Sequence, residues 1–215
     1  MATHNYFFGA GEPDSTGIRI QGTDQVVLGN YFQDLGRSGF SMTDGTPDDL
    51  YVRVERATVA FNTFVNCRDP FLIGVNHSSY PTGTTPQDCV IVGNVFYARA
   101  KPTDTTRPFM HLVKGDEPIN WTWRDNFVSS AIVGDFDFTG ITVNDSVPQM
   151  SSIGIFLPAD KTAGQEIDYG YGQISEIDVA GQVRRRFTTP GAIQLPLNDD
   201  KTPPLTEADF ESLLR

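Results

Sequence analysis

A short motif that recurs between residues 5 and 128 constrains the fold more than any other feature of the sequence. In the motif an asparagine is followed two residues later by a phenylalanine. Its copies are Asn5-Tyr6-Phe7, Asn30-Tyr31-Phe32, Asn62-Thr63-Phe64, Asn94-Val95-Phe96 and, in a weaker form, Asn126-Phe127-Val128. The asparagines are spaced 25, 32, 32 and 32 residues apart, and the copies follow β-rich segments such as Val26-Val27-Leu28. A period of this length predicts a repeat architecture built from β-strands.

The geometry of a strand predicts how the copies stack. Alternate residues of a β-strand share a face, so the asparagine and phenylalanine of each copy are expected to point inward together. Stacking the copies about 4.8 Å apart places each amide under the next amide and each ring under the next ring. The predicted fold is therefore all-β, a right-handed parallel β-helix. A β-sandwich is the alternative, but sandwich strands recur about every 8–12 residues. The ladder residues are Asn5, Asn30, Asn62, Asn94, Phe7, Phe32, Phe64 and Phe96.

The sequence divides into three predicted parts. Residues 1–134 form the rungs of the β-helix. Residues 135–200 keep β character but lose the motif, so we expect extended segments packed along the solenoid. Residues 201–215 form a terminal tail, in which Thr206 is predicted to cap a short helix with Asp209 in the capping-box position.

The charge balance argues against a nucleic-acid-binding protein. The 16 basic and 27 acidic residues give a formal net charge of −11, whereas affinity for phosphate backbones comes from clustered lysine and arginine. The acidity is concentrated in residues 116–215, which carry 7 basic and 16 acidic side chains, while residues 1–115 carry 9 and 11. The rungs are nearly neutral and can still present a basic surface to a polyanion.

Membrane and disulfide-rich classes are also disfavoured. No apolar run approaches the roughly 20 residues that cross a bilayer, so we expect no membrane span. The chain starts Met1-Ala2-Thr3-His4 and shows no basic or apolar leader, so we expect no signal peptide in this sequence. Cys67 and Cys89 have no metal-binding spacing and are predicted to be small core residues.

Several segments of the rung region resemble polysaccharide lyase family 6, the group of chondroitinase B and alginate lyases. The resemblance extends over about residues 3–130 and is most specific in Phe61-Asn62-Thr63-Phe64-Val65-Asn66-Cys67. Further matching segments are Gly17-Ile18-Arg19-Ile20-Gln21-Gly22, Gly29-Asn30-Tyr31-Phe32-Gln33, Pro86-Gln87-Asp88-Cys89 and Gly93-Asn94-Val95-Phe96. The resemblance implies a right-handed parallel β-helix, an acidic polysaccharide partner (alginate or a glycosaminoglycan), and an extracellular or periplasmic location.

The chemistry that the resemblance implies is β-elimination of uronate polysaccharides. It needs a cation that neutralises the sugar carboxylate, a base for the α-proton and an acid for the leaving oxygen. In the family these are implied to be a calcium ion held by Asn and Glu, a lysine, and the arginine of an Arg-His-Gly motif. This sequence contains no Arg-His-Gly, its first lysine is Lys101, and Glu12 is its only glutamate before Glu55. We therefore expect little or no elimination, no calcium ligands in this chain, and a non-catalytic carbohydrate-binding or structural β-helix as the alternative.

The candidate binding residues are arginines. The resemblance implies that Arg19 binds a sugar carboxylate, for which its planar fork is suited; the alternative is a solvated strand residue. Arg37 is predicted as a second substrate-binding residue, and Arg53, Arg56 and Arg68 are further candidates. The family pattern carries an arginine at the position of Ser41.

Other candidate sites are weaker. His77 and Tyr80 form a fallback base and acid in a polar loop, where such residues are more often simple turn residues. Trp121 and Trp123 share one strand face and form either a sugar-stacking platform or a cover for the last rung. The run Arg184-Arg185-Arg186 is predicted to be a solvated edge. Asp135, Asp137, Asp145 and Asp178 form a calcium set only if folding assembles them. The exposed edge near Asn5 to Gly9 predicts self-association through the first rung.

Overall fold

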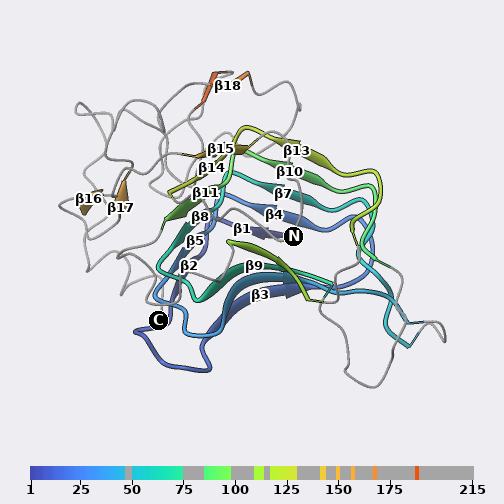
Figure 1. The fold of residues 1–215 in the computed structure, drawn as a ribbon, viewed down its shortest axis with the longest axis horizontal. Coiled ribbons are helices and arrows are strands. Elements are labelled where there is room, and N and C mark those ends of the chain that lie inside the picture. Colours follow the sequence, from blue (N-terminus) through green and yellow to red (C-terminus); the bar gives the residue numbers. More distant parts are fainter. Residues whose placement is uncertain are drawn as a thin grey trace.

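The computed structural model describes residues 1–46, 50–74, 85–97, 109–113 and 117–129, together with the backbone of five short strands further along the chain. These residues form β-strands, turns and bends, and no helix occurs among them. Fifteen strands wind through three parallel sheets, so that successive turns of the chain contribute strands to each sheet in succession (Figure 1). Such a turn is called a rung here. The prediction of an all-β parallel β-helix is confirmed.

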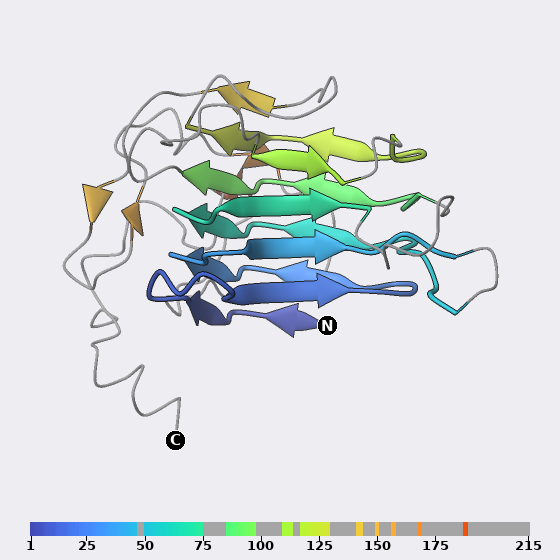
Figure 2. The same ribbon diagram turned by 60° about the horizontal axis from the view of Figure 1, so that its bottom comes forward.

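The three sheets are named A, B and C in the order in which a rung enters them. Sheet A contains β1 (Ala2–Thr3), β4 (Val26–Leu28), β7 (Thr58–Ala60), β10 (Val90–Val92) and β13 (Thr122–Arg124). Sheet B contains β2 (Tyr6–Phe8), β5 (Tyr31–Gln33), β8 (Thr63–Val65), β11 (Val95–Tyr97), β14 (Asn126–Val128) and β15 (Ile141–Val143). Sheet C contains β3 (Thr16–Ile20), β6 (Ser38–Met42), β9 (Asp69–Ile73) and β12 (Met110–Leu112). The strands lie one above another in rung order (Figure 2).

The asparagine ladder stands at the bend between sheets A and B. Each side-chain amide donates to the Oδ1 atom of the asparagine on the next rung, at 2.9–3.0 Å, through Asn5, Asn30, Asn62, Asn94 and Asn126. The same Oδ1 atoms accept the backbone N–H of the preceding ladder asparagine. From Asn30 to Asn126 these side chains have no exposed surface. The ladder supplies the polar partners that a buried amide needs, as the motif predicted.

The phenylalanine ladder fills the interior beside it. Phe7, Phe32, Phe64 and Phe96 stack with ring centroids 4.6–4.9 Å apart and interplanar angles of 3–7°. The rings pack so closely on sheet C that a Cβ atom added to Gly39 would lie 2.7 Å from Cδ1 of Phe64. In the weak fifth copy, Val128 occupies the ladder position, as its pairing with Phe96 shows.

The bends of each rung repeat a left-handed backbone conformation. At the bend between sheets C and A, Asp24, Arg56, Asp88 and Asn120 all have φ between 52° and 57°, and they are spaced 32 residues apart. At the bend before the ladder, His4, Phe61 and Asp125 adopt a similar φ, and Gly29 and Gly93 occupy the same place. Positive φ is uncommon outside glycine, so its regular recurrence indicates that the rung geometry imposes it.

Trp121 and Trp123 pack against the core at the far end of the described rungs. Both rings are half-buried and stack on each other at 5.2 Å. The Trp121 indole N–H donates to the carbonyl of Pro86 at 3.0 Å, and Trp123 meets Phe71 edge-on at 5.8 Å. These contacts favour a cover for the core over an outward-facing sugar platform.

The C-terminal part is described only as short strand backbones. β16 (Gln149–Met150) pairs with β17 (Phe156–Leu157), and β18 (Ile167–Asp168) pairs with β19 (Phe187–Thr188), both antiparallel. The helix predicted near Thr206 lies outside the described residues, and the part boundaries at 134 and 200 remain predictions. The described part of the chain contains no helix long and apolar enough to cross a membrane.

Candidate binding face on sheet C and its following bend

The outer face of sheet C carries an exposed arginine on its first strand. In β3, Ile18 and Ile20 pack on the core, so the side chain between them, Arg19, points outward and is exposed. Arg19 pairs in register with Ser41, then with Leu72 and His111 on the following rungs. Ser41 is buried, with 5% of its surface exposed, and it leaves the second rung without a cation in this row. Figure 2 brings this sheet to the front.

Arg37 and Arg68 lie at the other end of the same sheet. Arg37 directly precedes β6 and is four residues before the partner of Arg19, which corresponds to about 13 Å along a strand. Arg68 precedes β9 on the next rung, and its Nε lies 3.8 Å from Asp69. Both arginines are exposed. The structure thus puts Arg19 and Arg37 on one sheet but at opposite ends of it.

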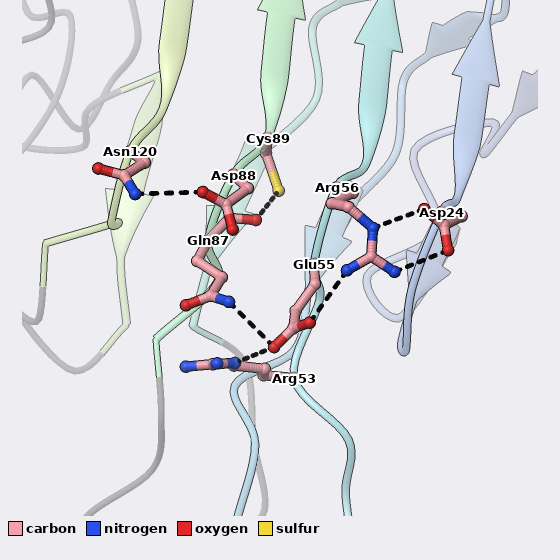
Figure 3. A network of polar contacts seen from close by, with 8 residues as sticks. All are labelled: Asp24, Arg53, Glu55, Arg56, Gln87, Asp88, Cys89 and Asn120. Carbon is pink, nitrogen blue, oxygen red and sulfur yellow. Dashed lines mark hydrogen bonds and ion pairs between the residues drawn. The ribbon is translucent and has the colours of Figure 1, made fainter.

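A polar network occupies the bend between sheets C and A (Figure 3). Arg56 donates to both carboxylate oxygens of Asp24 on the rung before it, each at 2.8 Å. The hydrogen bond from Arg56 lowers the pKa of Asp24, and the same contact raises the pKa of Arg56. Two rungs further along, Asn120 donates to Asp88 at 3.2 Å. Arg56 is therefore already paired with Asp24.

Glu55 connects three other side chains of this network. Its Oε1 atom accepts from Nε of Arg53 at 2.5 Å and from the amide of Gln87 at 3.1 Å. Its Oε2 atom lies 3.4 Å from Nη1 of Arg56. Sequence reasoning identified the arginines but not their anchors. The signal was the 32-residue spacing from Asp24 through Arg56 and Asp88 to Asn120, the same period as the asparagine ladder.

The remaining candidates lie outside the described residues: they are His77, Tyr80, the Arg184–Arg186 run and the four aspartates from Asp135 to Asp178. Within the described residues, no group of three or more His, Cys, Asp or Glu side chains could hold a metal ion. Cys67 and Cys89 are buried, as predicted.

The fold and this face define a parallel β-helix that exposes arginine on one sheet. The family model described as chondroitinase B matches residues 1–169, and the chain belongs to that family. Among solved structures, the PL6 family alginate lyase AlyGC matches with a TM-score of 0.55 and 20% identity, over 74% of this chain and 22% of that one. An arginine-to-alanine mutant of AlyGC matches with a TM-score of 0.54 and 21% identity over the same shares. No curated protein matches the sequence. The chain thus spans less than a quarter of the length of the solved structures named here.

Proposed function

We propose that this chain is the polysaccharide-binding part of a β-helix lyase and that it binds acidic uronate polymers on the outer face of sheet C. The main support for this proposal is the exposure of Arg19 on that face, while its neighbours in β3 pack inward. A guanidinium binds a carboxylate through two parallel N–H donors, a geometry that a lysine cannot reproduce. Arg37 is proposed as a second contact at the opposite end of the sheet. An extracellular or periplasmic location belongs to the same proposal.

The proposal assigns binding without elimination to this polypeptide. β-Elimination needs a neutralised carboxylate and a positioned base and acid, and the sequence has no Arg-His-Gly motif and no lysine before Lys101. No step of the proposal uses a calcium ion.

The test measures binding and turnover separately. Alginate, polymannuronate and dermatan sulfate oligomers are titrated with the protein, and unsaturated uronate ends are followed by ultraviolet absorbance with and without calcium. We expect binding that weakens with salt and no product. Arg19→Gln should weaken binding about 10-fold or more, since a hydrogen bond to a charged group is worth about 1.5–3 kcal/mol. Arg56→Gln is the matched control, because Arg56 is already paired with Asp24. Robust turnover would overturn the binding-only assignment.

A structural role is the second candidate, and the first rung favours it. Among the described residues, nothing donates to Oδ1 of Asn5, whereas every later ladder asparagine accepts two N–H groups there. Phe8 on the same rung is 56% exposed. An open edge with these groups invites pairing with another strand. Light scattering over a concentration series tests self-association, and a monomer at every concentration would contradict it. If no polymer binds at any ionic strength, only the structural role survives.

A further inference from the structure

Arg53 is held on the outside of the β-helix, in the segment between β6 of sheet C and β7 of sheet A. Val54 has no exposed surface and points into the core, so Arg53 and Glu55 on either side of it both project outward. The two side chains are only 26% and 21% exposed, and Nε of Arg53 donates to Oε1 of Glu55 at 2.5 Å. A surface arginine normally loses side-chain entropy when it binds a ligand. Arg53 has already lost part of that freedom in the unliganded protein.

Glu55, which holds Arg53, is itself held by a neighbouring side chain. The Oε1 atom of Glu55, which accepts from Arg53, also accepts from Gln87 on the following rung at 3.1 Å, whereas Arg56 contacts only the other oxygen, Oε2, at 3.4 Å. Arg53 uses only its Nε in this network. Its two terminal nitrogens have no hydrogen-bond partner among the residues that the structure describes, and Figure 3 shows them extending away from Glu55. The part of the guanidinium that binds carboxylates is thus left open.

The position of Arg53 relates it to the face that carries Arg19. The N–H of Gly22 donates to the carbonyl of Val52 at 3.3 Å, and the carbonyl of Gly22 accepts from Glu55 at 3.2 Å. Arg53 therefore lies beside Gly22, three residues after Arg19, or about 10 Å along an extended chain. Gly22 has a φ of 82°, and no atom lies within 4 Å of the place where a side chain would begin. The surface between the two arginines is open at this point.

We propose that Arg53 is a further carboxylate-binding residue, which takes a different uronate unit of the same polymer from the one bound by Arg19. The inference rests on the proposed function. Ser41, in register with Arg19, places no cation beside it on the second rung. Arg37 of that rung lies at the other end of the sheet, and Arg53 supplies a cation from the bend that follows. The terminal nitrogens donate two N–H groups to the carboxylate, while Glu55 acts as a positioning residue that fixes the direction of the fork.

The experiment compares Arg53→Gln with Arg56→Gln in the full chain, using alginate oligosaccharides and their carboxyl-reduced, neutral counterparts as probes. Both variants remove one guanidinium bonded to Glu55, but only Arg53 has open terminal nitrogens. We expect Arg53→Gln to raise the Kd for alginate about 10-fold and to make its salt dependence shallower. Arg56→Gln should change the Kd by no more than about twofold, and the neutral oligomer should bind equally weakly to all variants. A dermatan sulfate titration distinguishes carboxylate from sulfate, because loss of affinity for dermatan sulfate alone would overturn the carboxylate assignment.

The role of Glu55 is tested by a double-mutant cycle. Glu55→Gln should weaken alginate binding in the parent protein but have no effect in the Arg53→Gln background, whereas a merely structural role would weaken both equally. Arg53→Lys keeps the positive charge but removes the planar guanidinium, and it should raise the Kd less than Arg53→Gln does. If Arg53→Gln proves less stable, the Kd of Arg53→Lys tests the binding role instead. If Arg19→Gln weakens binding and Arg53→Gln behaves like Arg56→Gln, this inference is overturned while the proposed function stands. If the parent protein binds no uronate oligomer, the proposed function fails first.

Discussion

Replacing Asn62 by alanine in the middle of the ladder tests what holds the rungs together. Asn62 is fully buried. Its amide donates to the carbonyl of Val27 at 3.0 Å and to Oδ1 of Asn94 at 2.9 Å. Its Oδ1 accepts the backbone N–H of Asn30 at 2.9 Å and the Asn30 amide at 3.0 Å. One truncation therefore breaks four hydrogen bonds across three rungs.

The expected loss of stability depends on which hydrogen-bonding groups lose their partner. The buried N–H of Asn30 loses the acceptor it has in the structure, which costs about 1–3 kcal/mol. The Asn30 amide keeps its bond to Ala2, and Oδ1 of Asn94 keeps the backbone N–H of residue 62. With about 1 kcal/mol for each of the other three lost bonds, we expect Asn62→Ala to lower the free energy of unfolding by roughly 4–6 kcal/mol. That is a large part of the roughly 5–15 kcal/mol typical of a whole domain.

Asn5→Ala is the matched control, because Asn5 carries the same residue type at the open end of the same ladder. It is exposed and accepts nothing on its Oδ1 from the described residues, so truncation loses one amide bond to Asn30 and roughly 1 kcal/mol or less. Urea unfolding followed by circular dichroism and by tryptophan fluorescence measures both variants. Equal losses of stability in the two variants would refute the argument. Complete loss of a folding transition only in Asn62→Ala would support it.

Two further predictions concern packing in the interior. Gly39→Ala should destabilise the protein by about 1–3 kcal/mol in urea unfolding, because its Cβ would lie 2.7 Å from the Phe64 ring and 2.8 Å from the backbone oxygen of Pro70; unchanged stability would mean that the ring moves freely. Burial raises the pKa of Cys67 to about 12 and that of Cys89 to about 11, so neither thiol should react with iodoacetamide at pH 8 until urea is added. Stoichiometric labelling of the folded protein would contradict their burial.

The rung architecture was predictable because its signal is periodic and local. The 32-residue spacing of Asn62 and Asn94 fixes which strands lie side by side, and the two-residue offset to Phe64 fixes which face they share. The same argument anticipated that the fifth copy is weak, and Val128 indeed replaces the ring there. The direction of Arg19 followed from its isoleucine neighbours only once β3 was known to be a strand of sheet C.

The contacts of the other arginines were not predictable, since each depends on a residue from another rung. Arg56 looks like Arg53 in the sequence, yet Asp24, 32 residues earlier, accepts from its Nε and Nη2 atoms, while Arg53 is held by its Nε alone. A count of charges treats Arg53 and Arg56 alike, because it does not show which of their N–H groups already donate hydrogen bonds.

The sequence by itself determined the parallel β-helix, its ladders and the identity of the buried asparagines and phenylalanines, because a repeat stacks like residues whatever the loops between them do. Only the tertiary structure decided which cations remain open to a ligand. A bend brings together side chains whose contacts depend on the path of each loop, and that path is set by the packing of neighbouring rungs. The availability of Arg19 and Arg53, and the loss of Arg56 to Asp24, are therefore properties of the folded stack.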